Sequence, residues 1–148
     1  MTRRAIRFEL VALMLGSMLV WTPMAFAEMV KYKADLNASN AVPPVDDSKG
    51  SGTLEAVYDT ATKKLTYTVT YKDLTGPVTA AHFHGPADTK STAGVVVPAK
   101  DFSTSPIKGE ATLTDAQAAD LAAGKWYFNI HTAAHKGGEM RGQVTKGM

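Results

Sequence analysis

Apolar and polar residues alternate along much of this chain, most regularly over residues 65–71, where leucine, tyrosine, valine and tyrosine alternate with three threonines. Successive side chains of an extended strand point to opposite faces, so this period of two predicts strands with one buried and one solvated face. The pattern recurs at residues 30–36 and 54–58, and the polar residues 59–63 have the length of a hairpin loop. Further strands are predicted at residues 77–84, 94–98, 107–113, 125–132 and 139–145.

One segment, residues 115–123, has the features of a helix instead. Thr114 is a suitable capping residue, Gln117 completes a capping box with it, good helix formers follow, and Gly124 ends the segment. Seven or eight short strands with a single helix predict an all-β fold, an antiparallel Greek-key or immunoglobulin-like β-sandwich.

The first 27 residues have the composition of an export signal. A basic head is followed by an apolar run over residues 10–20 and by a small-x-small cleavage pattern at residues 25–27. The apolar run is shorter than the roughly 20 residues that a membrane-spanning helix needs, although an uncleaved leader would act as an anchor. We therefore predict a signal peptide over residues 1–27, cleavage before Glu28, a single domain over residues 28–148, and a periplasmic or secreted location.

The net charge of +2 resides in this leader. Without its three arginines and one glutamate, the chain has equal numbers of basic and acidic residues, so nothing favours a nucleic-acid or anionic-membrane partner. The chain has no cysteine, which excludes disulfides, thiolate metal ligands, iron–sulfur clusters and cysteine nucleophiles. It has neither a nucleophile elbow nor a serine beside a histidine, which argues against a hydrolase.

The four histidines lie in two short motifs, residues 81–86 and 129–135. In the first motif His82 and His84 alternate, so in a strand both lie on one face about 6 to 7 Å apart, a spacing that lets both bind one metal ion. In the absence of thiolates, imidazole ligands favour copper or zinc, whereas an added carboxylate would favour non-haem iron or manganese. We therefore predict a copper site, with zinc as the alternative.

The second motif supplies two more candidate ligands. By alternation His131 points away from Trp126, Phe128 and Ile130, so it faces outward or into a cleft if those residues fill the core. This position supports a role as a metal ligand. His135 belongs to the turn over residues 134–138, where a solvated histidine and a ligand are equally consistent with the sequence. For the whole group, the alternative to a metal site is a cluster of hydrogen-bonded histidines.

Arg141 is the single arginine outside the leader. A fixed positive charge beside an open copper would attract and orient a small anion such as superoxide, which makes Arg141 the candidate catalytic residue. Alternatively, Arg141 binds Glu139 or a backbone carbonyl and closes the last hairpin. Glu139 and Arg141 share one face of a strand by alternation, so a contact between them, or between Glu139 and a histidine, is consistent with the sequence.

Four ordered segments resemble the motifs of the chordin-type (CHRD) domain: residues 36–45, 81–87, 126–132 and 137–144. They span nearly all of the chain after the leader. The family occurs in secreted bacterial proteins and as repeats in the extracellular animal protein chordin. The resemblance implies an immunoglobulin-like sandwich and does not by itself imply a chemistry.

The histidine pattern is also similar to that of copper superoxide dismutases, Greek-key β-sandwiches that hold copper with a His-x-His pair and further histidines. By this likeness His82 and His84 resemble the pair, and His131 and His135 resemble the further ligands. Arg141, which follows two glycines, resembles the arginine beside the open copper. The chain has no disulfide and no segment like the second, zinc-binding subsite, so the similarity is to the copper-only forms.

Three classes of function remain open. The first is a copper enzyme such as a superoxide dismutase, and the second is a copper- or zinc-binding module without turnover. The third is a structural or adhesive extracellular domain. Copper carriers often contain methionine-rich tracts, and the only methionines after the leader are Met29, Met140 and Met148, which argues modestly against a carrier.

Overall fold

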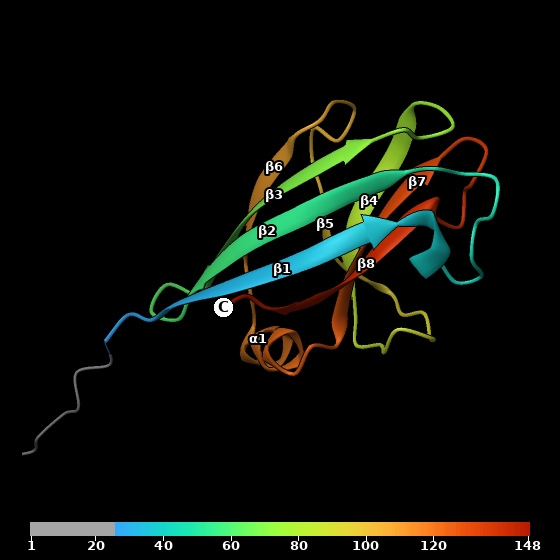
Figure 1. Cartoon of the computed structure of the whole chain (residues 1–148). Coiled ribbons are helices and arrows are strands. Elements are labelled where there is room, and N and C mark those ends of the chain that lie inside the picture. Colours follow the sequence, from blue (N-terminus) through green and yellow to red (C-terminus); the bar gives the residue numbers. More distant parts are fainter. Residues whose placement is uncertain (1–25) are drawn as a thin grey trace, which may run out of the picture.

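The computed structural model describes residues 26–148, which form one sheet of eight antiparallel strands and one short α-helix (Figure 1). All but the last two residues of the predicted signal peptide lie outside the described residues. The prediction of an all-β fold is confirmed, and every strand begins and ends within three residues of its predicted limits. The elements are β1 (Met29–Asn37), the 3-10 turn η1 (Ala38–Asn40), β2 (Ser51–Asp59), β3 (Lys64–Lys72), β4 (Val78–His84), β5 (Val95–Pro98), β6 (Ile107–Thr112), α1 (Asp115–Ala122), β7 (Trp126–Thr132) and β8 (Met140–Lys146).

The strands follow the order β5-β4-β7-β8-β1-β2-β3-β6 in one continuous sheet. The sheet curls, so that β1, β2 and β3 form the front layer in Figure 1 and β4, β7 and β8 lie behind them. Contact between the layers is direct, because the ring of Tyr67 on β3 lies edge-on to that of Phe83 on β4, with centroids 4.9 Å apart. The predicted sandwich is therefore a nearly closed sheet whose two halves are joined by the pairing of β1 with β8.

The alternation predicted for the strands positions the core. On β3, Leu65, Tyr67 and Val69 are buried, whereas the threonines between them are exposed or half-buried. Burying a large apolar side chain stabilises the fold by about 1.5–3 kcal/mol relative to leaving it exposed. The largest apolar side chains that are fully buried come from both halves of the sheet and from α1: Trp126, Phe83, Phe128, Leu36, Leu54, Leu65, Ile107, Leu121, Ile130 and Met140.

Strand β7 departs from simple alternation because both of its faces are covered. Trp126, Phe128 and Ile130 lie in the core, as their alternation predicts. Tyr127 and Asn129 on the opposite face are also buried, because chain segments that follow β4 and β7 fold over them. This covered outer face of β4 and β7 carries the candidate site.

Helix α1 begins with the predicted capping box. The Thr114 hydroxyl accepts a hydrogen bond from the N–H of Gln117 at 3.2 Å, and the Gln117 side chain accepts one from the N–H of Thr114 at 2.9 Å. Gly124 follows the helix with a φ of +70°, a conformation that glycine adopts without steric cost. The helix buries Leu121 in the core. Within residues 26–148, no helix has the length and apolar character needed to cross a membrane.

Candidate metal centre

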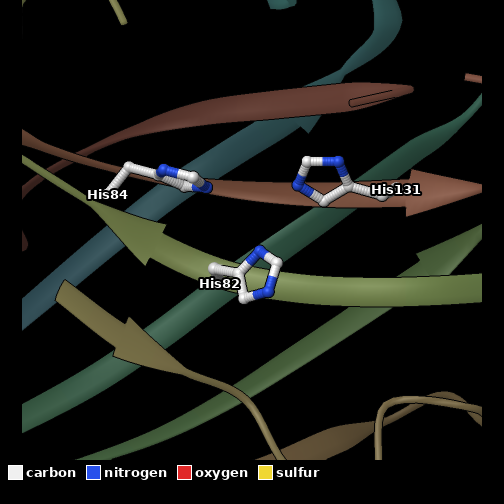
Figure 2. Close-up of side chains that lie close together, drawn as sticks. All are labelled: His82, His84 and His131. Atoms are coloured by element: carbon white, nitrogen blue, oxygen red, sulfur yellow. The ribbon is translucent and has the colours of Figure 1, made fainter. Parts of the chain in front are cut away.

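Three histidines lie together on the covered outer face, two from β4 and one from β7. The register partner of His131 on β4 is Ala80, so His82, two residues farther along, is the diagonal neighbour of His131 on the same face. His84 follows His82 by one more alternation. Figure 2 shows the three rings around a common centre, each with one nitrogen directed toward it. One potential ligand atom from each ring lies within 4.8 Å of the other two.

Backbone carbonyls fix the orientation of two of these rings. Nδ1 of His84 lies 2.9 Å from the carbonyl oxygen of Ala93, and Nδ1 of His131 lies 2.8 Å from that of Lys136. A carbonyl oxygen only accepts hydrogen bonds, so Nδ1 of both rings carries the proton and Nε2 keeps its lone pair. Both Nε2 atoms are buried and have no hydrogen-bond partner among the described residues.

His82 faces the same centre with its other nitrogen. Its Nδ1 is buried and also lacks a partner in the described part of the chain. The His82 ring centroid lies 5.2 Å from that of His131 and 5.5 Å from that of His84. Three buried nitrogens therefore converge without hydrogen bonds, and each unsatisfied buried polar group costs about 1–3 kcal/mol.

The environment keeps the imidazoles of His82 and His84 uncharged. Burial lowers the pKa of His82 below its ordinary value, and the neighbouring His131 and His84 lower it further. Burial also lowers the pKa of His84, against the opposing effect of its hydrogen bond to Ala93. Both rings are therefore neutral at neutral pH, which is the state in which imidazole binds a metal.

Tyr127 supports the cluster from the neighbouring position on β7. Its ring stacks on that of His84 with the centroids 4.9 Å apart and the planes 3° from parallel. The Tyr127 hydroxyl accepts a hydrogen bond from the N–H of Ala93 at 3.2 Å, and the carbonyl of the same Ala93 accepts one from His84. Sequence reasoning missed this role: alternation places Tyr127 on the same face as His131, but no sequence signal identifies its bond to Ala93.

Arg141 lies on the other side of Tyr127, on β8. Its guanidinium carbon is 3.6 Å from the centroid of the Tyr127 ring, and β7 lies between β4 and β8, so Tyr127 separates Arg141 from His84. The side chain is 2 % exposed and donates to the carbonyls of Ser91, at 2.8 Å, and Asp88. These contacts correspond to the structural alternative expected for Arg141, in which it binds backbone carbonyls. The structure therefore places it beside the loop after β4 and not in the histidine cluster.

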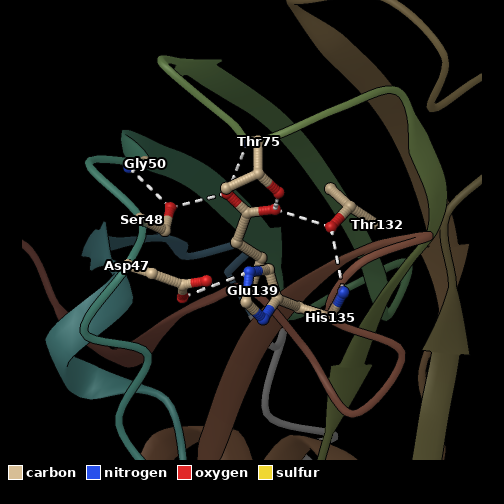
Figure 3. A network of polar contacts seen from close by, with 7 residues as sticks. All are labelled: Asp47, Ser48, Gly50, Thr75, Thr132, His135 and Glu139. Atoms are coloured by element: carbon tan, nitrogen blue, oxygen red, sulfur yellow. Dashed lines mark hydrogen bonds and ion pairs between the residues drawn. The ribbon is translucent and has the colours of Figure 1, made fainter.

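Glu139 binds neither of the partners that strand alternation suggested. It precedes β8 and is fully buried. Its carboxylate accepts hydrogen bonds from three hydroxyls, those of Ser48 (2.6 Å), Thr75 (2.7 Å) and Thr132 (2.6 Å) (Figure 3). It also accepts one from the N–H of Thr75 at 2.8 Å. Among the described residues, neither Arg141 nor a histidine donates to it. Burial alone would raise the pKa of Glu139, but the hydrogen bonds from Ser48, Thr132 and Thr75 outweigh burial, so the pKa is lowered. Glu139 thus joins the loops after η1 and β3 to the end of β7.

His135 lies apart from the other three histidines. Its Nε2 lies 3.4 Å from a carboxylate oxygen of Asp47, and its backbone N–H donates to the Thr132 hydroxyl at 3.3 Å (Figure 3). In residues 26–148, the histidines within ligand distance of one another are His82, His84 and His131. A turn residue does not follow strand alternation, and here the turn after β7 directs His135 toward the loop that carries Asp47.

A comparison with family models shows a match over residues 32–144 to the model described as the CHRD domain. The matched region includes most of β1 and β8, every element between them, and the three clustered histidines. No curated protein and no solved structure matches the chain.

Proposed function

The chain belongs to the CHRD domain family, and we propose that it is a periplasmic or secreted protein whose His82, His84 and His131 bind a copper ion. The location is supported by the expected signal peptide and by the occurrence of the family in secreted proteins. The observation that carries the metal proposal is the convergence of three buried nitrogens that have no hydrogen-bond partner among the described residues.

A metal ion accounts for these nitrogens better than a hydrogen-bonded histidine cluster does. In such a cluster the rings would share N–H···N bonds. The protons of His84 and His131 instead point to carbonyls, so the inward nitrogens of both rings are acceptors. Two lone pairs that face a common centre repel each other, whereas a cation binds both.

The donor set favours copper or zinc over other ions. Three imidazoles with no carboxylate in the group match the ligand preferences of these metals, and nitrogen sites bind copper(II) more tightly than zinc. Copper is therefore the preferred ion for this site, and zinc is the alternative. Two nitrogens that each lie 2.0–2.1 Å from one ion are at most about 4.2 Å apart. Ring rotation must therefore shorten any nitrogen–nitrogen distance in the cluster that is close to 4.8 Å. The His82 ring has no hydrogen bond to the described residues and is free to make this adjustment.

Superoxide dismutation is the second candidate. Three protein ligands leave a coordination position open, as in catalytic rather than structural sites, and His82 and His131 are only half-buried. The charge of Arg141 is close enough to contribute to the lowered pKa of His84, and the same positive potential would attract a small anion. Because the Tyr127 ring lies between Arg141 and His84, we expect Arg141 to raise the rate of dismutation through its electric field and not through contact with the anion.

Metal titration of the protein and matched variants tests the primary proposal. Copper(II) and zinc(II) are titrated separately into metal-free protein by calorimetry, and bound metal is measured by elemental analysis. We expect one ion per chain, loss of this ion in the double variant His82→Ala/His84→Ala, and its retention in His135→Ala. Far-UV circular dichroism checks that each variant is folded. Stoichiometric metal in the folded double variant, or loss of the ion in His135→Ala, would contradict a three-histidine centre.

Turnover is tested separately on the copper-loaded protein. The reference is the superoxide loss produced by free copper–histidine complexes at the same copper concentration. A faster rate that falls at high salt supports dismutation assisted by the charge of Arg141, because salt screens that charge. A rate no higher than the reference would exclude superoxide dismutation as the function and would favour a metal-binding module without turnover.

A further inference from the structure

A second candidate site lies beyond Tyr127, on the side away from the histidines. A cavity of about 360 Å³ is lined by residues 39–42 and 44, which follow β1, by residues 89–90, and by Arg141 and Gln143 of β8. We propose that this cavity binds a small organic carboxylate, with the carboxylate group on Arg141 and the apolar part against the segment after β1.

The charge of Arg141 has no counter-ion in contact. Within residues 26–148 its hydrogen-bond partners are neutral oxygens: the carbonyls of Ser91 and Asp88 and the side-chain oxygen of Gln143. The carboxylate of Asp88 is bound to the N–H groups of Lys90 and Ser91. A buried charge is costly unless it is paired, and the planar guanidinium matches the geometry of a carboxylate. The Asp88 carboxylate attracts Arg141 without contacting it, and the Tyr127 ring lies against the guanidinium. An anion in the cavity would therefore add the direct ion pair that Arg141 lacks in the described protein.

The lining of the cavity favours an organic anion over an inorganic one. Asn40 and Thr89 contribute neutral polar groups, Lys90 adds a second positive charge at the exposed rim, and no described residue that lines the cavity is acidic. Val42 and Pro44 provide apolar surface that would contact a short hydrocarbon chain. The volume is near the lower end of the range for ligand pockets, roughly 300–1,000 Å³, so the ligand must be small.

This site is separate from the proposed metal centre. Its residues belong to β8, the segment after β1 and the loop after β4, whereas the three histidines project from β4 and β7. The ring of Tyr127 lies between Arg141 and His84. Carboxylate binding therefore requires no metal, and the proposal stands or falls independently of the copper site.

An NMR titration tests the proposal, with Arg141 as the reporter. Residues 28–148 contain one arginine, so the protein that begins at Glu28 gives a single arginine Nε–H signal. We expect sodium butyrate to shift this signal saturably, and we expect no such shift from butanamide, which has the same carbon chain without the charge, or from sodium chloride at equal ionic strength. No shift with butyrate, or an equal shift with chloride or butanamide, would overturn the proposal.

A charge reversal at the rim separates a site from general electrostatic attraction. Lys90 is exposed and its side chain has no hydrogen bond to the described residues, so Lys90→Glu should leave the fold intact. We expect this variant to weaken butyrate binding about fivefold, which corresponds to the largest contribution usual for an exposed pair of opposite charges. Lys108→Glu makes the same change at an exposed position on β6 and should leave binding unchanged. Equal weakening by the two variants would contradict a specific site at Arg141.

Discussion

The imidazole of His84 and the phenol ring of Tyr127 are stacked across neighbouring strands, 3° from parallel and with centroids 4.9 Å apart. The two residues are register partners in the pairing of β4 with β7. They also share Ala93, whose carbonyl accepts from His84 and whose N–H donates to Tyr127. The orientation of a proposed metal ligand therefore depends on a tyrosine that is not itself a proposed ligand.

The variant Tyr127→Phe isolates this dependence, because it keeps the stacked ring and removes the hydroxyl. We expect copper affinity to fall about tenfold, the lower end of the effect of residues that orient metal ligands. Competition with a chelator of known affinity measures the change. Tyr71→Phe is the matched control, since the Tyr71 hydroxyl donates to the carbonyl of Phe102 at 3.1 Å. Equal losses in the two variants, or an unchanged affinity in Tyr127→Phe, would contradict the positioning role.

Replacement of Glu139 by glutamine tests the buried carboxylate. The pKa of Glu139 is lowered in the folded protein, so its ionised form stabilises the fold above the ordinary glutamate pKa of about 4.3. This contribution is lost as the pH falls through the lowered folded value. We expect Glu139→Gln to cost about 2–4 kcal/mol at neutral pH, because glutamine has a neutral acceptor oxygen and puts a donor NH₂ where hydroxyls donate to the second carboxylate oxygen.

Urea unfolding of the parent and of Glu139→Gln from neutral to acidic pH measures this effect. The difference in the free energy of unfolding should shrink as the pH falls, since the parent loses its charged acceptor there. A difference that stays constant with pH, or a variant as stable as the parent at neutral pH, would show that the carboxylate is not the stabilising group.

Two adjacent glycines provide a matched test of the loop that holds His131. Gly138 has a φ of +119°, and an added Cβ would overlap the amide of Asn129, whereas an added Cβ at Gly137 meets no described atom within 4 Å. We expect Gly138→Ala to lower the free energy of unfolding by about 2–3 kcal/mol, and Gly137→Ala to change it by less than about 0.5 kcal/mol. Chemical denaturation measures both. Similar effects of the two substitutions would argue against a conformational requirement at Gly138.

The exported protein should begin at Glu28. Strand β1 starts at Met29, so cleavage at this point leaves every strand of the described sheet complete. Mass spectrometry of protein recovered from the periplasm or the medium gives the N-terminus. Retention of residues 1–27 in a membrane fraction would contradict the proposed location.

The strands and the three clustered histidines were predictable because both depend on local alternation. A period of two reports which face of a strand is buried, and it also places His82 and His84 on one face. The same alternation on β7 sets His131 opposite Phe128 and Ile130, and the register of β4 with β7 then brings it beside His82. One short-range rule therefore predicts most of the fold and the core of the candidate site.

The remaining features depend on contacts between distant segments, which alternation does not report. His135 points toward Asp47 because two loops meet, and the donors to Glu139 come from loops after η1 and β3. The outer face of β7 is likewise covered by loops, and the sequences of these loops have no periodic pattern that would predict where they lie. Ala93 contributes only backbone groups to the site, so its side chain gives no indication of the role.

Anomalous diffraction at the copper absorption edge, recorded from copper-loaded crystals, tests the central proposal most directly. We expect one strong peak within about 2.0–2.2 Å of three atoms, Nδ1 of His82 and Nε2 of His84 and of His131. A peak at His135 and Asp47, or a peak from which any of the three histidines is absent, would contradict the proposed centre.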